Sequence, residues 1–110
     1  MKNKILLVSG EPNSINSEII YKSLKKMSNK FQKRIYLISN YELIKKQLEL
    51  LKYKKKLVKV KNLYEISNKN ELKIIDISLK FKNPFKVSNK ESSKFVINSL
   101  NCAHNYSLNE

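Results

Sequence analysis

Two short segments rich in apolar residues, each followed by a helical pattern, constrain the fold of this 110-residue chain more than any other feature. Residues 4–9, KILLVS, form an apolar run bounded by a turn, which is typical of a strand buried on both faces. Residues 34–39, RIYLIS, are a second short run, rich in Ile and Tyr. Apolar residues then recur at helical spacing, over about 17–29 and again after the N-cap residue Asn40. The expected stripes are Ile20, Leu24 and Met27 in the first helix and Ile44, Leu48 and Leu51 in the second. This alternation predicts an α/β fold.

The second half of the chain continues the pattern and ends in a helix. Residues 57–60 and 72–78 are strand candidates, and a loop is expected over 79–87. Ser88 and Glu91 have the spacing of a capping box, which marks the start of a helix. The apolar stripe expected for that helix, which extends to about Tyr106, is Val96, Leu100 and Ala103. No repeat or linker divides the chain, so a single domain is expected over residues 1–110.

The formal net charge of the chain is +14 at pH 7. A net charge this positive ordinarily suggests nucleic acid or an anionic membrane surface as a partner. However, Arg34 is the single arginine among 23 basic residues, whereas proteins that read bases and phosphates favour the bidentate guanidinium. The lysine excess is therefore interpreted as bulk composition, and neither a nucleic acid nor a membrane is expected as a partner.

The cysteine content and the apolar runs bear on the compartment. Cys102 is the single cysteine, which excludes an internal disulfide and a cysteine-based metal site. No segment approaches the roughly 20 consecutive apolar residues that a membrane span requires. A soluble, cytoplasmic protein is the expectation.

Three residues with reactive side chains lack the neighbours that catalysis requires. His104 has no Asp or Glu one turn upstream to orient its ring, and Cys102 has no histidine at a suggestive spacing. Asp76 lies in a strand candidate, where a carboxylate bonded to nearby backbone is the plainer interpretation, although a cleft position is the alternative. No catalytic or metal-binding residue is therefore assigned in this chain.

The turn after the first strand is the candidate for function, because an α/β protein places its ligand where a strand turns into a helix. It contains Gly10, the single glycine of the chain. Ser14, Asn16 and Ser17 precede the first helical turn, whose free N–H groups can hold an anion, but capping explains these residues equally well. The candidate substrate-cleft loop consists of Gly10, Glu11, Pro12, Asn13, Ser14, Asn16 and Ser17.

This loop resembles the opening of the 4-hydroxythreonine-4-phosphate dehydrogenase family, where an apolar strand leads into G-D-P-A-G-I-G-P-E-I. The residues that match are Gly10, Pro12, Ile15, Glu18 and Ile19, and Glu11 replaces the aspartate. Ser14 and Asn16 stand where the family has glycines, and Ser17 replaces a proline.

The resemblance continues along most of the chain. RIYLISNYELIKKQLELL is similar to the family's second strand and helix. IIDISLKFKNPFKVSNKESSKFVINSLNCA is similar to a later V-I-D-L strand, its loop and a G-K-x-S-x-x-N-G helix, in which Lys86 and Ser88 match.

The resemblance implies a three-layer α/β/α, isopropylmalate-dehydrogenase-like fold, of which this chain is a partial, N-terminal domain. It implies a homodimeric enzyme of pyridoxal phosphate biosynthesis that oxidises a phosphorylated small-molecule substrate with NAD and a divalent metal ion and then decarboxylates it. Family members are about three times as long, and their metal-binding histidines follow this region. Neither cofactor nor turnover is therefore expected of the segment alone.

Two alternatives remain open. A related enzyme acting on threonate or erythronate 4-phosphate would share this region almost indistinguishably. A non-enzymatic protein that uses its basic surface to bind phosphate-rich ligands or nucleic acid is the alternative from a different class, and its binding would weaken steeply with salt.

Overall fold

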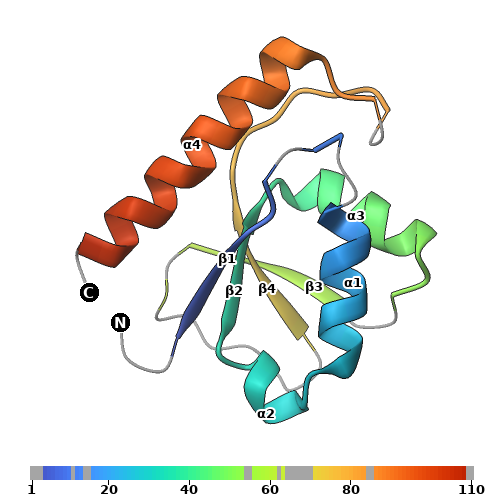
Figure 1. The fold of residues 1–110 in the computed structure, drawn as a ribbon, viewed down its shortest axis with the longest axis vertical. Helices are drawn as coiled ribbons and strands as arrows, with labels where there is room; N and C mark the ends of the chain where they lie inside the picture. The colour runs from blue at the N-terminus through green and yellow to red at the C-terminus, as the bar shows by residue number, and fades with distance from the viewer. Residues whose placement is uncertain are drawn as a thin grey trace.

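A parallel sheet of four strands forms the centre of the computed structural model, which describes residues 4–10, 12–13, 16–53, 56–61, 63, 71–83 and 86–108. The sheet order is β1-β2-β4-β3, and neighbouring strands are parallel (Figure 1). In chain order the elements are β1 (Ile5–Val8), α1 (Asn16–Lys26), α2 (Asn29–Gln32), β2 (Ile35–Ser39), α3 (Tyr41–Leu50), β3 (Lys56–Val60), β4 (Glu71–Asp76) and α4 (Asn89–Leu108).

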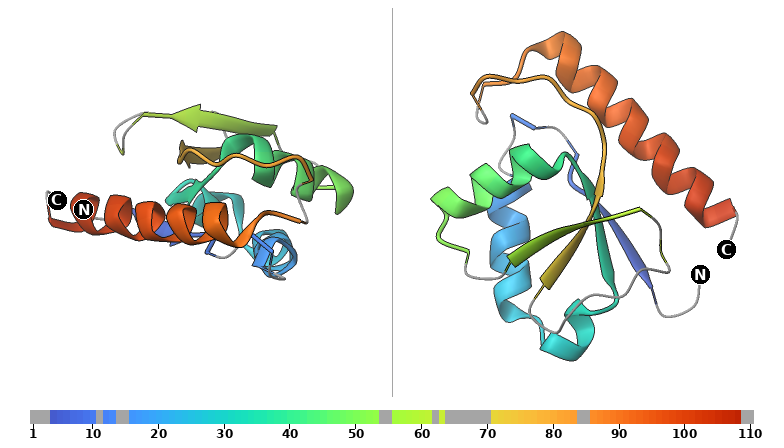
Figure 2. Two further views of the ribbon diagram at one scale, coloured as in Figure 1. Left: turned by 90° about the horizontal axis from the view of Figure 1, so that it is seen from above. Right: turned by 180° about the vertical axis from the view of Figure 1, so that it is seen from behind.

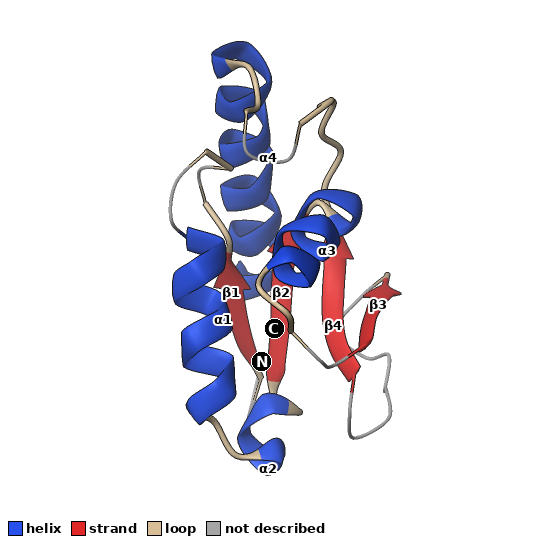
Figure 3. Cartoon of the chain, turned by 90° about the vertical axis from the view of Figure 1, so that its right-hand side faces the viewer, coloured by secondary structure: helices blue, strands red, loops and turns tan. Residues whose placement is uncertain are grey.

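Helices cover the sheet on both faces, which confirms the predicted three-layer α/β fold. Figure 3 shows α1 and α3 on one side of the strands and α4 on the other, and the left view of Figure 2 shows the same layers edge on. None of the helices in the described ranges has the length and apolar content needed to cross a bilayer.

The core is divided into two clusters by the alternation of side chains along the strands. On the α1 and α3 face the buried residues are Ile20, Leu24, Ile35, Leu37, Ile44, Leu48, Leu57, Leu72 and Ile74. On the α4 face they are Tyr36, Ile38, Val60, Leu63 and Ile75, with Cys102, Ala103 and Tyr106 packed against them. All five residues of β2 are buried, so this strand is enclosed on both faces. The prediction of burial on both faces for residues 4–9 was wrong, because β1 lies at the edge of the described sheet and its four residues are half-buried.

The first helix is shorter than the predicted segment over about 17–29, because α1 ends at Lys26 and the short helix α2 follows. The side-chain amide of Gln32 donates to the carbonyl oxygen of Leu24 at 2.7 Å and to that of Met27 at 3.2 Å. These carbonyls lie at the C-terminal end of α1, where backbone donors become few, and the Leu24 carbonyl also accepts from the N–H of Met27 at 3.3 Å. Gln32, which lies beyond α1, therefore provides hydrogen-bond donors for carbonyls at the end of this helix. The apolar periodicity alone does not reveal this role.

The buried face of α4 differs from the predicted stripe. Leu100 is 55% exposed, whereas Phe95 is 1% exposed and faces the interior together with Ser92 and Ser99. The predicted stripe was wrong in including Leu100 because apolar residues lie on two neighbouring rows of this helix. The row with the large rings of Phe95 and Tyr106 packs inward, and small serines on that row let the helix lie close to its neighbours.

Truncation of Phe95 and of Leu100 separates the two rows experimentally. We expect Phe95→Ala to lower the free energy of unfolding by about 3–5 kcal/mol, because it leaves a cavity in the core. Leu100→Ala should change it by less than about 0.5 kcal/mol, since the side chain is mostly in water. Chemical denaturation of both variants measures the difference, and equal losses would show that the predicted stripe is the buried one.

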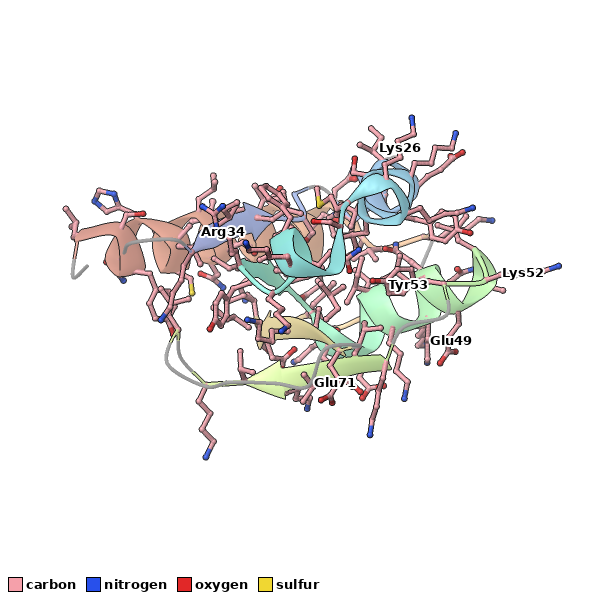
Figure 4. All side chains as sticks on the ribbon, turned by 90° about the horizontal axis from the view of Figure 1, so that it is seen from below. Lys26, Arg34, Glu49, Lys52, Tyr53 and Glu71 are labelled. Atoms are coloured by element: carbon pink, nitrogen blue, oxygen red, sulfur yellow. The ribbon has the colours of Figure 1, made fainter. Side chains whose placement is uncertain are left out.

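Helix α3 ends in a Schellman motif built on a lysine. The N–H of Tyr53 donates to the carbonyl of Leu48, and that of Lys52 donates to the carbonyl of Glu49, both at 3.0 Å. Lys52 has a φ of 62°, in the left-handed region that glycine occupies most easily. Figure 4 shows its side chain directed away from the body of the protein. The backbone of Lys52 therefore ends the helix at a steric cost.

Replacement of Lys52 by glycine should relieve this cost. We expect Lys52→Gly to raise the free energy of unfolding by about 1 kcal/mol, because glycine adopts positive φ without strain. Lys45→Gly, at an exposed position inside the same helix, is the matched control and should lower it by about 1 kcal/mol. Thermal denaturation measures both changes, and a destabilising Lys52→Gly would contradict the strain at this residue.

Candidate functional site

The carboxyl edge of the sheet is the candidate functional site, since the strands of a parallel sheet all end there and present their loops together. Strand β1 leads into Ser9 and Gly10, β2 leads into Asn40, and β4 ends at Asp76. Figure 1 shows these ends at the same side of the sheet, near the start of α3 and the loop that precedes α4.

Polar side chains at this edge bind the backbone of neighbouring segments. The side-chain oxygen of Asn40 accepts from the N–H of Leu43 at 3.0 Å, and its amide nitrogen donates to the carbonyl of Ile77 at 2.9 Å. An oxygen of the Asp76 carboxylate accepts from the N–H of Tyr41 at 2.8 Å. Asn40 is thus the predicted N-cap of α3, and Asp76 has the backbone-bonded position favoured from the sequence. Both side chains fix the junction between β2, β4 and α3.

The predicted substrate-cleft loop, called the opening loop below, is fixed by the backbone conformation of Gly10 and by a hydrogen bond from α3. Gly10 has a φ of 76°, so the single glycine of the chain stands at a position that requires left-handed backbone. Pro12 is buried, and its carbonyl accepts from the side-chain amide of Gln47 in α3 at 3.2 Å. The buried polar residue Gln47 thereby anchors the loop to the helical layer.

Asn13 joins the opening loop to the segment before α4. Its amide nitrogen donates to the carbonyl of Val87 at 2.6 Å, and its side-chain oxygen accepts from the N–H of Val87 at 2.7 Å. A longer contact of 3.4 Å reaches the hydroxyl of Ser92. This pair of hydrogen bonds connects residues 74 positions apart, and no local pattern in the sequence indicates it.

The structure describes some residues of the predicted substrate-cleft loop and leaves others undescribed. Gly10, Pro12 and Asn13 lie at the carboxyl edge, where the contacts above fix the backbone of the loop. Glu11 and Ser14 lie outside the described residues. Asn16 and Ser17 form the start of α1, and their side chains are outside the described part of the structure. The role of the loop as a substrate cleft therefore stays a prediction.

Loss of the Asn13 amide should loosen this connection. We expect Asn13→Ala to lower the free energy of unfolding by about 1–3 kcal/mol, because it leaves the N–H and carbonyl of the buried Val87 without these partners. Asn13→Asp should have a smaller effect, since it keeps an acceptor for the Val87 N–H.

Amide hydrogen exchange of Val87 measures the local effect, and it should be faster in Asn13→Ala. Asn98→Ala removes an exposed amide from α4 and serves as the control, with no change expected at Val87. Equal exchange rates at Val87 in the wild-type chain and Asn13→Ala would contradict the connection.

The reactive residues of α4 do not converge on the carboxyl edge. Cys102 is half-buried against the sheet, and burial raises the pKa of its thiol, which disfavours the thiolate needed for nucleophilic attack. His104 is exposed on the same helix. Among the described residues, no three His, Cys, Asp or Glu side chains gather as a metal site would require.

Lys73 is a buried titratable residue that the sequence pattern did not single out. Its ammonium lies 3.9 Å from the ring centroid of Tyr36 and donates to the carbonyl of Lys33 at 2.5 Å. Burial lowers the pKa of Lys73, and the neighbouring charge of Lys4 lowers it further. The ring and the carbonyl compensate the buried charge, so the arrangement is structural.

The parallel sheet, its two helical layers and the loops gathered at one edge make this chain an α/β protein of the open, parallel-sheet class. Its fold matches part of two solved dehydrogenase structures. A protein from Salmonella typhimurium assigned as a 4-hydroxythreonine-4-phosphate dehydrogenase matches with a TM-score of 0.78 and 15% sequence identity, over 99% of this chain and 34% of that chain. A 4-hydroxythreonine-4-phosphate dehydrogenase from Klebsiella pneumoniae matches with a TM-score of 0.77 and 18% identity, over 96% of this chain and 34% of that chain.

These TM-scores show a shared fold, and the chain spans about one third of the length of the structures that it matches. No protein-family model and no curated protein sequence matches the chain.

Proposed function

We propose that this chain is the N-terminal part of a 4-hydroxythreonine-4-phosphate dehydrogenase. The observation that carries the proposal is the match of the fold to 4-hydroxythreonine-4-phosphate dehydrogenase structures over 96–99% of this chain. The pairing of Asn13 with Val87, at 2.6 and 2.7 Å, is consistent with it. This pairing joins the two segments whose sequences resemble this family, the opening loop and the segment from β4 into α4.

In the proposed complete enzyme, NAD and a divalent metal ion supply hydride acceptance and polarisation of the substrate hydroxyl. The substrate is a phosphorylated small molecule, and the working form is a cytoplasmic homodimer. The described residues of this chain do not form a site for the metal ion. They contain no cluster of metal ligands, and the polar side chains of Asn13, Asn40 and Asp76 already bind backbone. No step of the reaction is therefore assigned to this chain.

The contribution of this chain is the position of the opening loop. Gly10 permits the turn after β1, Gln47 holds the carbonyl of Pro12, and Asn13 ties the loop to Val87. A loop fixed in this way provides one wall of a cleft at the carboxyl edge without reorganisation when a substrate binds. Loss of either anchor should therefore reduce kcat/KM of the complete enzyme.

The test is the coding sequence beyond the codon for Glu110 and the activity of the complete product. We expect roughly two further thirds of the protein, with three separated histidines, and metal-dependent formation of NADH from 4-hydroxythreonine 4-phosphate. Threonate 4-phosphate and erythronate 4-phosphate, assayed in parallel, identify a related enzyme if they are turned over instead. A stop codon followed by an unrelated gene would exclude a dehydrogenase encoded by this reading frame.

Two variants of the complete enzyme test the role of the loop. Asn13→Ala should lower kcat/KM by about tenfold or more, which corresponds to roughly 1.4 kcal/mol of lost transition-state stabilisation. Asn98→Ala, the exposed amide on α4, should leave kcat/KM unchanged. Equal kcat/KM values for the two variants would contradict a positioning role of the opening loop.

A further inference from the structure

We propose that a basic groove beside the start of α4 binds the phosphate group of a small organic ligand. The basic groove is defined by its lining residues, Lys80, Phe81, Lys82, Lys86 and Ser88, and has a volume of about 470 Å³. This size is within the range of small-molecule sites, roughly 300–1,000 Å³. The inference rests on the groove itself, so it is independent of the reaction assigned to the complete protein.

The backbone of the loop after β4 brings the groove lysines together. Asn83 and Lys86 form an antiparallel bridge, and the N–H of Lys86 donates to the carbonyl of Asn83 at 3.0 Å. The chain therefore folds back on itself, so that Lys82 and Lys86 line the same groove. The next residue, Val87, is fixed by its two hydrogen bonds to Asn13. The backbone between two lining residues, Lys86 and Ser88, is thus fixed by contacts within the chain.

The charge of the groove is not balanced by the described part of the chain. The ammonium groups of Lys80, Lys82 and Lys86 have no hydrogen-bond or ion-pair partner among the described residues. Lys46 adds a fourth positive charge nearby, with its ammonium 5.5 Å from the ring centroid of Phe81. Like charges repel one another at such a site, and an anion removes this repulsion on binding.

Other lysines of the chain are placed differently. Lys22 pairs with Glu18 at 3.2 Å, and Lys73 is compensated by the Tyr36 ring and a carbonyl. A high lysine content alone therefore does not produce a cluster of uncompensated ammonium groups around a cavity. The basic groove differs from these sites by combining concavity with unpaired charge.

The chemistry of the lining favours a phosphate ester or a diphosphate. Lysine ammonium groups bind phosphate as point charges, and several of them match the charge and the multiple oxygens of this group. The hydroxyl of Ser88 accepts from the N–H of Glu91 at 3.3 Å, and its own proton remains available as a donor. The half-buried ring of Phe81 offers an apolar surface for the organic part of the ligand. The phosphate can come from a substrate ester or from a nucleotide.

The experiment is a titration of the isotope-labelled chain by NMR at a constant ionic strength of about 0.15 M. Glycerol 3-phosphate and ADP are the two probes. We expect saturable shifts of the backbone amides of Lys82, Lys86 and Ser88 with at least one probe. The absence of saturable shifts at these amides with both probes would overturn the proposal.

Two double variants separate the groove from the overall charge. Lys82→Gln with Lys86→Gln should weaken binding by about tenfold, because charge-assisted contacts to phosphate are lost. Lys26→Gln with Lys30→Gln removes the same net charge from exposed positions in α1 and α2, near the opposite end of the molecule in Figure 1, and should change the Kd less than twofold. Equal weakening by the two pairs would show binding by bulk charge and overturn the proposal.

Phe81→Leu distinguishes the two sources of phosphate, since it keeps an apolar side chain but removes the ring. Weaker binding of ADP with unchanged binding of glycerol 3-phosphate supports the proposal with a nucleotide as the ligand. Unchanged binding of both probes, together with loss in the Lys82 and Lys86 double variant, supports it with a simple phosphate ester. Circular dichroism of every variant checks that the fold is retained.

Discussion

The enclosure of β2 is the constraint on which the rest of the structure depends. Its five residues are buried, and it pairs with β1 on one side and β4 on the other. A strand in this position must satisfy its backbone through two neighbours and cover its side chains on both faces. Helices α1 and α3 cover the row with Ile35 and Leu37, and α4 covers part of the row with Tyr36 and Ile38. The three layers follow from the burial of this single strand.

The same strand determines what the carboxyl edge can do. Beyond Ser39, the chain turns at Asn40 into α3, and Asn40 and Asp76 use their polar atoms to hold that turn against β4. Gln47, from the buried side of α3, extends the support to Pro12. The described residues of the edge therefore form a frame that positions the loops. The chain spans about one third of the length of the dehydrogenase structures that it matches.

Composition sets the number of lysines in this chain, whereas the fold sets where they lie. Several of them lie over aromatic rings, as Lys45 and Lys59 do at 5.7 and 5.2 Å from the ring centroid of Tyr41. Such contacts let a chain of net charge +14 keep its cations close to an apolar body. Composition accounts for the number of lysines, whereas the course of the loop after β4 accounts for their gathering in the basic groove.

The sequence by itself determined the elements whose signals are local. The apolar runs gave β1 and β2, and the caps at Asn40 and Ser88 marked the starts of α3 and α4, because such signals involve residues within one turn of each other. Only the tertiary structure decided which row of α4 is buried, the sheet order β1-β2-β4-β3 and the pairing of Asn13 with Val87. These features depend on packing between segments far apart in the chain, and many alternatives share the same local patterns.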